Sequence, residues 1–348
     1  MKKVDYIVVG CGLAGIAFCE ELRKHHKSFV VFDNSSQQSS TVAAGLYNPV
    51  ILKRFSEVWK AKEQLEIALP YYQSLEVLLN KKLDYKFPIY RRFASIEEQN
   101  MWFEAADNVN LEPFLSSKVV SNTNDWVNAA FGFGEVLCAG RIDTPLLIEI
   151  YRQFLEKSSQ LIASDFDYKN LEVKEDGVSY NDFEASHVVF AEGFGLKKNP
   201  FFKDLPLNGT KGEVLLIRAK NLELNEAIKS SVFVIPLGED LYKVGATYNW
   251  NDKTNVPTVE GKEELISKLK GLINCDFEIV EQNAGIRPTV KDRRPLIGRH
   301  PVHKNLYVLN GLGTRGVMIA PYVAPKLYEY IEHGISLDPE IDIKRFIS

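Results

Sequence analysis

The stretch VDYIVVGCGLAGIAF, residues 4–18, decides the fold of this chain. Residues 4–9 form a β-branched run that stops at a glycine, and apolar residues then recur at helical spacing. The segment SFVVFD, residues 28–33, has the composition of a second strand. Together these segments predict a strand, helix and strand unit at the start of the chain.

The glycines of this stretch follow the spacing G-x-G-x-x-G at Gly10, Gly12 and Gly15. They allow a tight turn, a close approach of pyrophosphate to backbone, and close packing of the helix on the strand. The helix N-terminus offers unpaired N–H groups to the anion. Asp33 ends the second strand, where a carboxylate accepts ribose hydroxyls and repels a 2′-phosphate. The unit predicts a dinucleotide site without deciding between NAD and FAD.

The composition fits a globular chain with ordinary surface charge. Its 348 residues, 45% of them hydrophobic, can bury a sizeable core in about two domains. The formal net charge of −4 gives no global attraction to nucleic acid or to an anionic membrane. The four cysteines are scattered without metal-ligand spacing, which favours reduced thiols. We therefore expect a cytoplasmic protein without a metal site or a membrane segment.

The remaining chain changes character near residue 212. Before it, helical stretches are expected around 57–80 and at 144–157, the latter capped by Asp143 or Thr144, while 84–140 shows no clear period. After it, the longer strands GEVLLIRA, SVFVIPL, LYKVGATYNW and DFEIVEQNAG surround a helix at about 259–272. This pattern predicts a second domain built on an antiparallel sheet.

The full set of segments resembles the D-amino-acid-oxidase-like family of FAD-dependent oxidoreductases, most closely its glycine oxidase and sarcosine oxidase branch. The resemblance covers nearly the whole chain. It rests on VVGCGLAG, STVAAGLYNP (40–49), GRIDTPLL (140–147), VVFAEG (188–193), FVIP…LYKVGAT (233–247), GIRPTVKDRRPLIG (285–298) and NGLGTRGVMIAP (310–321). The last two segments are the most specific.

The resemblance implies an α/β fold, α+β overall, in which a Rossmann-like FAD-binding domain receives an inserted substrate domain of antiparallel β-sheet. The FAD-binding parts would be residues 1–83, 140–205 and 285–348, and the substrate-domain parts would be residues 84–139 and 206–284.

The chemistry implied by the resemblance is hydride transfer from a C–N bond of a small amine or amino acid to the flavin. The imine product is then hydrolysed by water, and oxygen is commonly the final electron acceptor. Members with covalently attached flavin carry a cysteine near the segment that here reads GIRPTVKDRRP, and this chain has none there. We therefore expect non-covalent FAD.

The segment NGLGTRGVMIAP repeats the glycine spacing at Gly311, Gly313 and Gly316. A second dinucleotide site would need another strand that ends in an acid about 20 residues further on, and none is predicted. A glycine-rich helix N-terminus there would instead aim backbone N–H groups at the pyrimidine edge of the same flavin, where they favour negative charge on the reduced ring. We expect one FAD, touched by both glycine-rich loops.

Two arginines are the main substrate-binding candidates. By its place in GIRP, Arg287 matches the arginine that binds the substrate carboxylate in amino-acid-oxidising relatives, and a planar guanidinium suits that role. The alternative is a structural arginine paired with Asp292 or Glu281. The family counterpart of Arg315 lies close to the substrate carboxylate in some relatives, so Arg315 is expected to join Arg287 or to stay beside the flavin.

Three tyrosines have hydroxyls that are expected to face a substrate, namely Tyr47, Tyr242 and Tyr248, although each also fits a half-buried sheet position. Glycine oxidase relatives tend to carry a tyrosine where this chain has Phe233. The absence of that hydroxyl removes one hydrogen bond to a substrate carboxylate, which argues against simple glycine-like substrates.

The expected site residues fall into two sets. The catalytic set is Arg287, Arg315, Tyr242 and Tyr248. The cofactor-binding set is Gly10, Gly12, Leu13, Ala14, Gly15, Asp33, Asn34, Ala43, Ala44, Gly45, Leu46, Ala191, Gly193, Arg287, Gly311, Gly313, Thr314, Arg315 and Gly316.

Three functions remain open at this point. The first is a small-molecule amine or amino-acid oxidoreductase. The second is an FAD oxidoreductase that removes a carboxymethyl group from a tRNA wobble uridine, because a loop similar to residues 40–55 occurs in that enzyme's flavin domain. The net charge gives no support for tRNA as a partner, although it stays an alternative. The third is a flavin-binding protein with weak or no catalysis.

Overall fold

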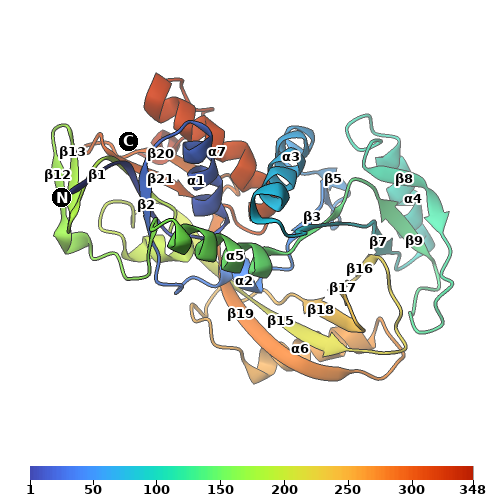
Figure 1. The fold of residues 1–348 in the computed structure, drawn as a ribbon. Coiled ribbons are helices and arrows are strands. Elements are labelled where there is room, and N and C mark those ends of the chain that lie inside the picture. The colour runs from blue at the N-terminus through green and yellow to red at the C-terminus, as the bar shows by residue number, and fades with distance from the viewer. Residues whose placement is uncertain (348) are drawn as a thin grey trace.

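Two eight-stranded sheets organise residues 1–347, which the computed structural model describes (Figure 1). The first sheet is built around parallel strands in the order β11, β2, β1, β14, β21. Their bounds are Leu161–Ile162, Phe29–Phe32, Lys2–Val9, Phe183–Phe190 and Leu306–Asn310. Three antiparallel strands complete this sheet: β12 (Leu171–Lys174), β13 (Gly177–Tyr180) and β20 (Leu296–Arg299).

Strand β1 is buried on both faces, as parallel strands usually are. Tyr6 and Val8 point into one apolar cluster, whereas Ile7 and Val9 point into another on the opposite face. The first cluster also packs helices against the sheet and against each other: α1 (Leu13–Lys24), α3 (Ala61–Leu79), α5 (Thr144–Lys157) and α7 (Gly316–His333). This arrangement directs the N-termini of α1 and α7 toward the same region.

The second sheet joins two distant stretches of the chain in the order β8, β9, β7, β16, β17, β18, β15, β19. All its pairs are antiparallel except β16 with β7, which is parallel. In that order the bounds are Leu115–Val120, Phe133–Val136, Ile89–Arg92, Ala227–Lys229, Phe233–Gly238, Leu241–Gly245, Leu207–Arg218 and Glu278–Val290. Helix α6 (Val259–Lys270) packs on one face over a third apolar cluster.

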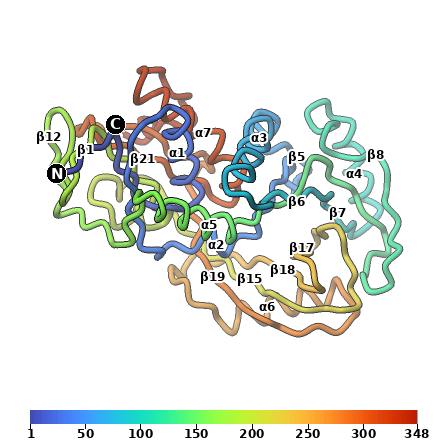
Figure 2. The backbone as a smooth tube through the Cα atoms, in the orientation of Figure 1, coloured from blue at the N-terminus to red at the C-terminus, as the bar shows by residue number. Residues whose placement is uncertain are grey.

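The long strands β15 and β19 connect the two halves of the molecule, and they run side by side in Figure 2. Leu207 and Val290 pair at one end, inside the core of the first sheet. Ile217 and Ile279 pair at the other end, within or against the core of the second sheet. Each end of this ribbon is therefore anchored in apolar packing.

Shorter elements lie between the sheets. Strands β3 (Leu46–Tyr47), β6 (Asp84–Lys86) and β10 (Gly140–Ile142) form a small sheet, and β4 (Val50–Ile51) pairs with β5 (Ser56–Glu57). The short helix α2 (Ser39–Val42) and helix α4 (Ile96–Ala106) complete this part, with 3-10 turns at 168–170, 193–198 and 343–346. None of the described helices has the length and hydropathy needed to cross a bilayer, and the four cysteines are free thiols.

Several expected boundaries differ from the structure. The helix expected from residue 57 begins at Ala61, and Asp143 is the cap of α5, because its side chain accepts a 3.3 Å hydrogen bond from the Leu146 N–H. The aperiodic segment 84–140 holds three strands of the second sheet. The boundary expected between residues 284 and 285 falls inside β19, because this strand keeps its pairing with β15 through residue 290.

We predict that Trp102→Ala lowers the free energy of unfolding by about 3–5 kcal/mol. Trp102 of α4 is 0% exposed, meets Phe55 and Phe93 edge to face, and donates a 2.9 Å hydrogen bond to the Ser116 carbonyl. The matched control Trp126→Ala removes a side chain that is 42% exposed, and it should cost less than about 1 kcal/mol. Urea denaturation measures both, and equal losses would contradict this packing.

Candidate functional site

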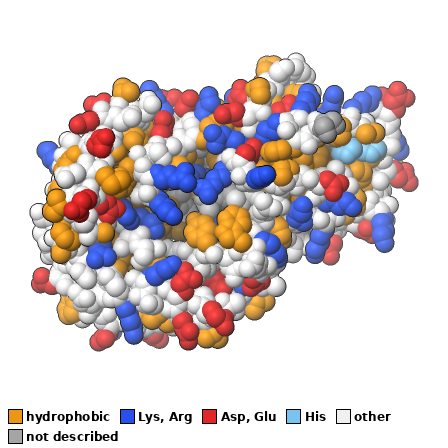
Figure 3. All heavy atoms as spheres, turned by 180° about the vertical axis from the view of Figure 1, so that it is seen from behind, with side chains coloured by type: hydrophobic (Ala, Val, Ile, Leu, Met, Phe, Trp, Pro, Cys, Tyr) orange, Lys and Arg blue, Asp and Glu red, His pale blue; other side chains and the backbone are white. Residues whose placement is uncertain are grey.

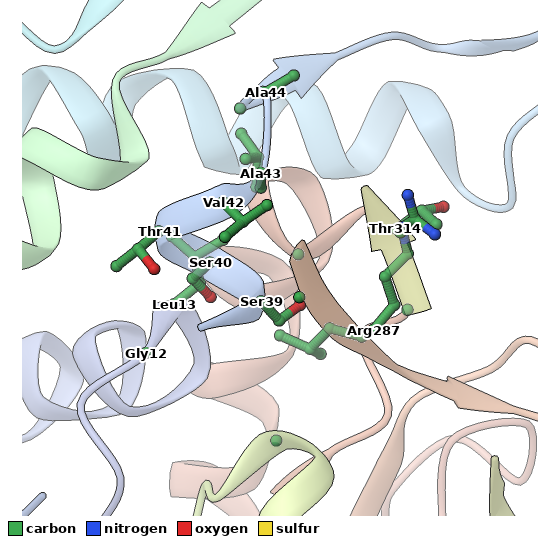
Figure 4. A pocket seen from close by; sticks show the side chains of 18 of the residues that line it. Gly12, Leu13, Ser39, Ser40, Thr41, Val42, Ala43, Ala44, Arg287 and Thr314 are labelled. Atoms are coloured by element: carbon green, nitrogen blue, oxygen red, sulfur yellow. The ribbon is translucent and has the colours of Figure 1, made fainter. Parts of the chain in front are cut away.

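A pocket of about 550 Å³ lies where the two sheets face each other. One wall is formed by the β1–α1 turn, by α2 and the residues after it, and by the loop before α7. The opposite wall consists of residues on one face of β15, β17, β18 and β19. Figure 4 shows residues 39–44 on one side of this pocket, with Arg287 across from them.

The β1–α1 turn places an uncapped helix N-terminus at the pocket. Gly10 has a φ of +104°, and a Cβ on Gly15 would lie 1.9 Å from the Gly10 carbonyl oxygen, so the helix approaches the strand as only glycine permits. Gly12 caps the helix without a side-chain hydrogen bond. Gly10 and Gly12 line the pocket, and Gly15 packs behind them. The free N–H groups are a ready anion site.

Asp33 lies at the pocket with both oxygens engaged. Its Oδ2 accepts a 2.8 Å hydrogen bond from the Cys11 N–H, and its Oδ1 forms an ion pair with Arg152. Arg152 lines the pocket from α5, one turn after Ile148. Asn34 was expected beside the cofactor, but it is exposed, bonds to Asp165 and does not line the pocket.

The small residues after α2 form a backbone surface that a flat group can approach. Ala43, Ala44, Gly45 and Leu46 line the pocket, and a Cβ on Gly45 would lie 1.8 Å from the Ile142 carbonyl oxygen. Lys243 reaches this loop from β18, because its Nζ donates to the Ala43 carbonyl at 3.2 Å. Burial lowers the pKa of Lys243. The loop is thus tied to the opposite wall.

Arg287 projects from β19 over a glycine of the neighbouring strand. A Cβ on Gly212 would lie only 1.9 Å from Nη2 of Arg287, so the guanidinium occupies space that a side chain would fill. Its Nη1 donates a 3.3 Å hydrogen bond to the Thr247 carbonyl, and its Cζ lies 4.5 Å from the Tyr248 ring centre. Burial lowers the pKa of Arg287.

Arg315 lies at the start of α7 on the facing wall. Its Nη1 donates a 3.0 Å hydrogen bond to the Asn48 carbonyl. Burial, together with the nearby charge of Arg293, lowers the pKa of Arg315 to about 10, against the opposing effect of Tyr248. Arg315 therefore remains charged at neutral pH and carries that charge into a buried pocket.

Neither of these guanidiniums has an acidic partner within residues 1–347. The structural alternative for Arg287 was a pair with Asp292 or Glu281. Asp292 instead pairs with Arg345 at 2.9 Å, and Glu281 makes no ion pair with an arginine. Two half-buried arginines without acidic partners favour an anionic ligand, because a charge that is partly removed from water and unpaired is costly.

The three tyrosines that were expected to face a substrate differ in whether they line the pocket. Tyr248 lines the pocket and is 61% exposed. Tyr242 is a correction: it points into the core of the second sheet, where its hydroxyl accepts a 3.3 Å hydrogen bond from the Leu224 N–H, because Lys243 takes the pocket face. Tyr47 is also buried, and its hydroxyl donates to Asp84 at 2.8 Å.

The two glycine-rich helix starts meet at one pocket. Gly313, Thr314 and Gly316 line it, and α7 begins without a side-chain cap. Gly311 has a φ of +74° and packs against Val290 behind the wall. Helices α1 and α7 pack against each other, so both free N-termini face the same space. This geometry suits the two ends of one elongated anionic cofactor.

Glu192 lies between two pocket residues that were expected beside the cofactor, Ala191 and Gly193. Its carboxylate accepts hydrogen bonds from the Tyr168 hydroxyl and, at 2.8 Å, from Asn199 Nδ2. Burial outweighs these bonds and raises the pKa of Glu192 to about 7. Its ionisation is therefore coupled to the stability of this wall.

Most expected residues come together, and several contributors were missed. Gly15, Asn34, Tyr47, Tyr242 and Gly311 do not line the pocket; the other expected residues do. Lining residues that sequence reasoning missed include Arg152, Glu192, Lys229 and Lys243. The spacing of Ile148 and Arg152 on one helix face was an available signal for Arg152. No group of metal-binding side chains is present within residues 1–347.

Comparisons with known proteins bear on the family and the fold of this chain. A family model described as FAD dependent oxidoreductase (DAO) matches residues 5–329. Glycine oxidase of Bacillus subtilis (strain 168) is 24% identical over 347 residues, covering 92% of this chain and 90% of that protein. The crystal structure of glycine oxidase from Geobacillus kaustophilus superposes with a TM-score of 0.80 at 18% identity, covering 98% of this chain and 100% of that one, which supports the fold.

A second kind of relative matches only part of this chain. The tRNA 5-methylaminomethyl-2-thiouridine biosynthesis bifunctional protein MnmC of Azoarcus sp. (strain BH72) is 26% identical over 181 residues. The match covers 46% of this chain and 28% of that protein.

We predict that two glycine substitutions separate folding from FAD binding. Gly15→Ala should lower the melting temperature of the apoprotein, because its Cβ would overlap the Gly10 carbonyl. Gly12→Ala should leave that temperature unchanged, because Ser40 Oγ lies 3.5 Å from the added Cβ, but it should weaken FAD binding about tenfold or more. Thermal denaturation and fluorescence titration with FAD measure both effects. Undiminished FAD affinity in Gly12→Ala would contradict this placement of the pyrophosphate.

We also predict that Glu192→Gln changes the pH dependence of stability. The pKa of Glu192 is raised in the folded state, so the folded protein binds more protons than the unfolded chain between about pH 4.5 and 7, and its free energy of unfolding falls as pH rises. The variant should gain up to about 3 kcal/mol over the natural protein across this window. Urea denaturation at several pH values tests this, with exposed Glu175→Gln as the control. A difference that stays constant with pH would refute the assignment.

Proposed function

The chain belongs to the DAO family of FAD-dependent oxidoreductases, and from this premise we propose that it oxidises the C–N bond of a small amino acid or amine bearing a carboxylate. The observation that carries the proposal is the pair of half-buried, acid-free guanidiniums of Arg287 and Arg315 at the pocket. The similarity to glycine oxidases over nine-tenths of the chain supports the same substrate class. We propose that FAD is held without a covalent bond.

The pocket residues fit FAD along its length. The uncapped N-terminus of α1 suits the pyrophosphate, and Asp33 with Arg152 suits the adenosine ribose. The small residues Ala43 to Gly45 give a flat ring room to approach the backbone. The uncapped N-terminus of α7 suits negative charge on the pyrimidine edge.

Arg287 is the group that would fix the substrate carboxylate. Its Nη1 bond to the Thr247 carbonyl and its stacking on Tyr248 hold the guanidinium plane, so the remaining N–H groups are preorganised. A bidentate bond to a carboxylate would satisfy them and neutralise the buried charge. Arg315 adds positive charge from the facing wall.

The same cations favour the reactive form of the substrate. A positive surrounding lowers the pKa of a bound ammonium group, so the amine is bound in its neutral form and no general base is required. The residues of this pocket would hold FAD, which when bound would supply the two-electron oxidant for the hydride of the substrate carbon; water would then hydrolyse the imine product. The chain's own residues contribute orientation and charge.

A panel of amino acids tests this function. Anaerobic mixing of the purified holoprotein with glycine, sarcosine, proline and D-amino acids should bleach the flavin absorbance with at least one of them. Bleaching excludes an inert flavin-binding role. A spectrum unchanged by every member of the panel and by related carboxylated amines would overturn the proposal.

A second candidate is a tRNA-modifying oxidoreductase, because about half of this chain is similar to part of the MnmC protein. Lys and Arg side chains also gather beside hydrophobic ones in the middle of the face seen in Figure 3. The net charge of −4 opposes a general affinity for nucleic acid. A salt-sensitive gel shift with tRNA would support this candidate, and indifference to tRNA would remove it.

We predict that Arg287→Lys lowers kcat/KM for a carboxylated amine about 30- to 1,000-fold, because the planar fork is lost from a buried charged contact. The effect on a matched amine without a carboxylate should be less than about tenfold. FAD content, read from the absorbance spectrum, should be unchanged. Arg218→Lys alters an exposed arginine outside the pocket and serves as the control. Equal losses for both amines would contradict a carboxylate-binding role.

A further inference from the structure

Lys229 is a half-buried lysine that lines the same pocket as Arg287 from the end of β16. Its Nζ lies 4.7 Å from the centre of the Phe233 ring, so the side chain leans over the neighbouring strand. Within residues 1–347 this Nζ makes no hydrogen bond and no ion pair. The cations nearest to it are already neutralised, since Arg91 pairs with Glu98 and Lys268 pairs with Glu264.

The surroundings of Lys229 lack the negative charge that a buried ammonium needs. Burial has the largest effect on its pKa, followed by the positive charges of Arg91 and Lys268, and together they lower that pKa to about 8. No acidic group is among the main influences on this pKa, because Glu264, which lines the same pocket, pairs with Lys268. A desolvated cation without a partner is unfavourable in the free protein, and a bound anion would relieve it.

The sheet directs Lys229 toward the substrate-binding arginine. Cross-strand partners run from Lys229 to Phe233, from Phe233 to Gly245 and from Gly245 to Val214, and such partners share one face of a sheet. Gly245 has no side chain, and the Val214 side chain leans over it, since a Cβ there would lie 2.7 Å from Val214 Cγ1; only small aliphatic groups therefore cover the middle of this row.

Arg287 marks the other end of this face. Its guanidinium lies over Gly212, two residues before Val214 on β15. Three strand spacings, about 14 Å at the backbone, separate Lys229 from Val214, and Gly212 lies two residues along β15 from that row. Lys229 leans over Phe233 at one end of this interval, and the Arg287 guanidinium covers Gly212 at the other. An elongated small molecule with an anionic group at each end is the kind of ligand that would contact both cations.

We propose that the substrate is an amino acid or secondary amine with a second anionic group, a carboxylate or a phosphonate, and that Lys229 binds this group while Arg287 binds the first carboxylate. The inference rests on the proposed C–N oxidation. It gives Phe233 a role: its ring supports the Lys229 ammonium through a cation–π contact. This contact needs the aromatic face and does not need a tyrosine hydroxyl. The amine would lie above Gly245.

Binding of acids that cannot be oxidised tests this inference on the FAD-loaded protein. Isothermal titration calorimetry should give a dissociation constant for glutarate about tenfold or more below that for butyrate, which has the same three-carbon chain beyond its carboxylate and lacks the second carboxylate. Comparison with 3-phosphonopropionate shows which second anion is preferred. Lys229→Met should remove the preference and leave butyrate affinity unchanged, whereas Lys229→Arg should retain it.

The matched control is Lys220→Met, which removes an exposed lysine outside the pocket and should keep the preference for the dianion. If Lys229→Met fails to bind FAD, Lys229→Gln replaces it. Equal affinity of the natural protein for glutarate and butyrate overturns the inference, as does a preference that survives loss of Lys229. These binding outcomes do not depend on turnover. A failure of the proposed oxidation, seen as an unbleached flavin, is therefore distinguishable from a failure of this inference.

Discussion

The close approach of Gly15 to the Gly10 carbonyl is the constraint on which the rest of the site depends. A Cβ at Gly15 would lie 1.9 Å from that oxygen, so α1 can sit this low on β1 only because the side chain is absent. Helix α7 packs against α1 in turn, with Gly316 facing Leu13, where an added Cβ would lie 3.1 Å from the leucine Cδ1. Two uncapped helix N-termini therefore converge on one pocket. The glycines at 10–15 therefore set the position of α1, and α7, which follows the glycines at 311–316, packs against α1.

The opposite wall owes its position to the β15–β19 ribbon. Because Leu207 and Val290 are buried in one core and Ile217 is buried in the other, the ribbon cannot shift without opening apolar packing at either end. Arg287 lies on this ribbon, over the bare backbone of Gly212. The cation is consequently held at a fixed height above the sheet and faces the helix termini. Placement by rigid strands, rather than by a loop, is what preorganises it.

Sequence reasoning recovered features whose signal is local. Glycine spacing, strand alternation and the Asp143 cap each follow from neighbouring residues. It failed where the fold decides which face of a strand meets the core and which meets the pocket. Strand β18 is covered on both faces: Tyr242 and Val244 enter the core, and Lys243 enters the pocket. The apolar pair at 242 and 244 was a usable sign that the core lies on that side. Lys229 carried no such sign, since its role depends on three strand pairings between distant segments.

Burial divides the pocket cations into two kinds. Arg315 keeps its proton at neutral pH even though burial lowers its pKa to about 10, and burial also lowers the pKa of Arg287, whose guanidinium is a strong base. Lys229, with a pKa near 8, holds its proton less firmly. An anion beside it would raise that pKa, so ligand binding and protonation are linked at Lys229 and hardly at all at the arginines. The arginines thus provide a constant charge for orientation, and the lysine provides a charge whose strength depends on what is bound.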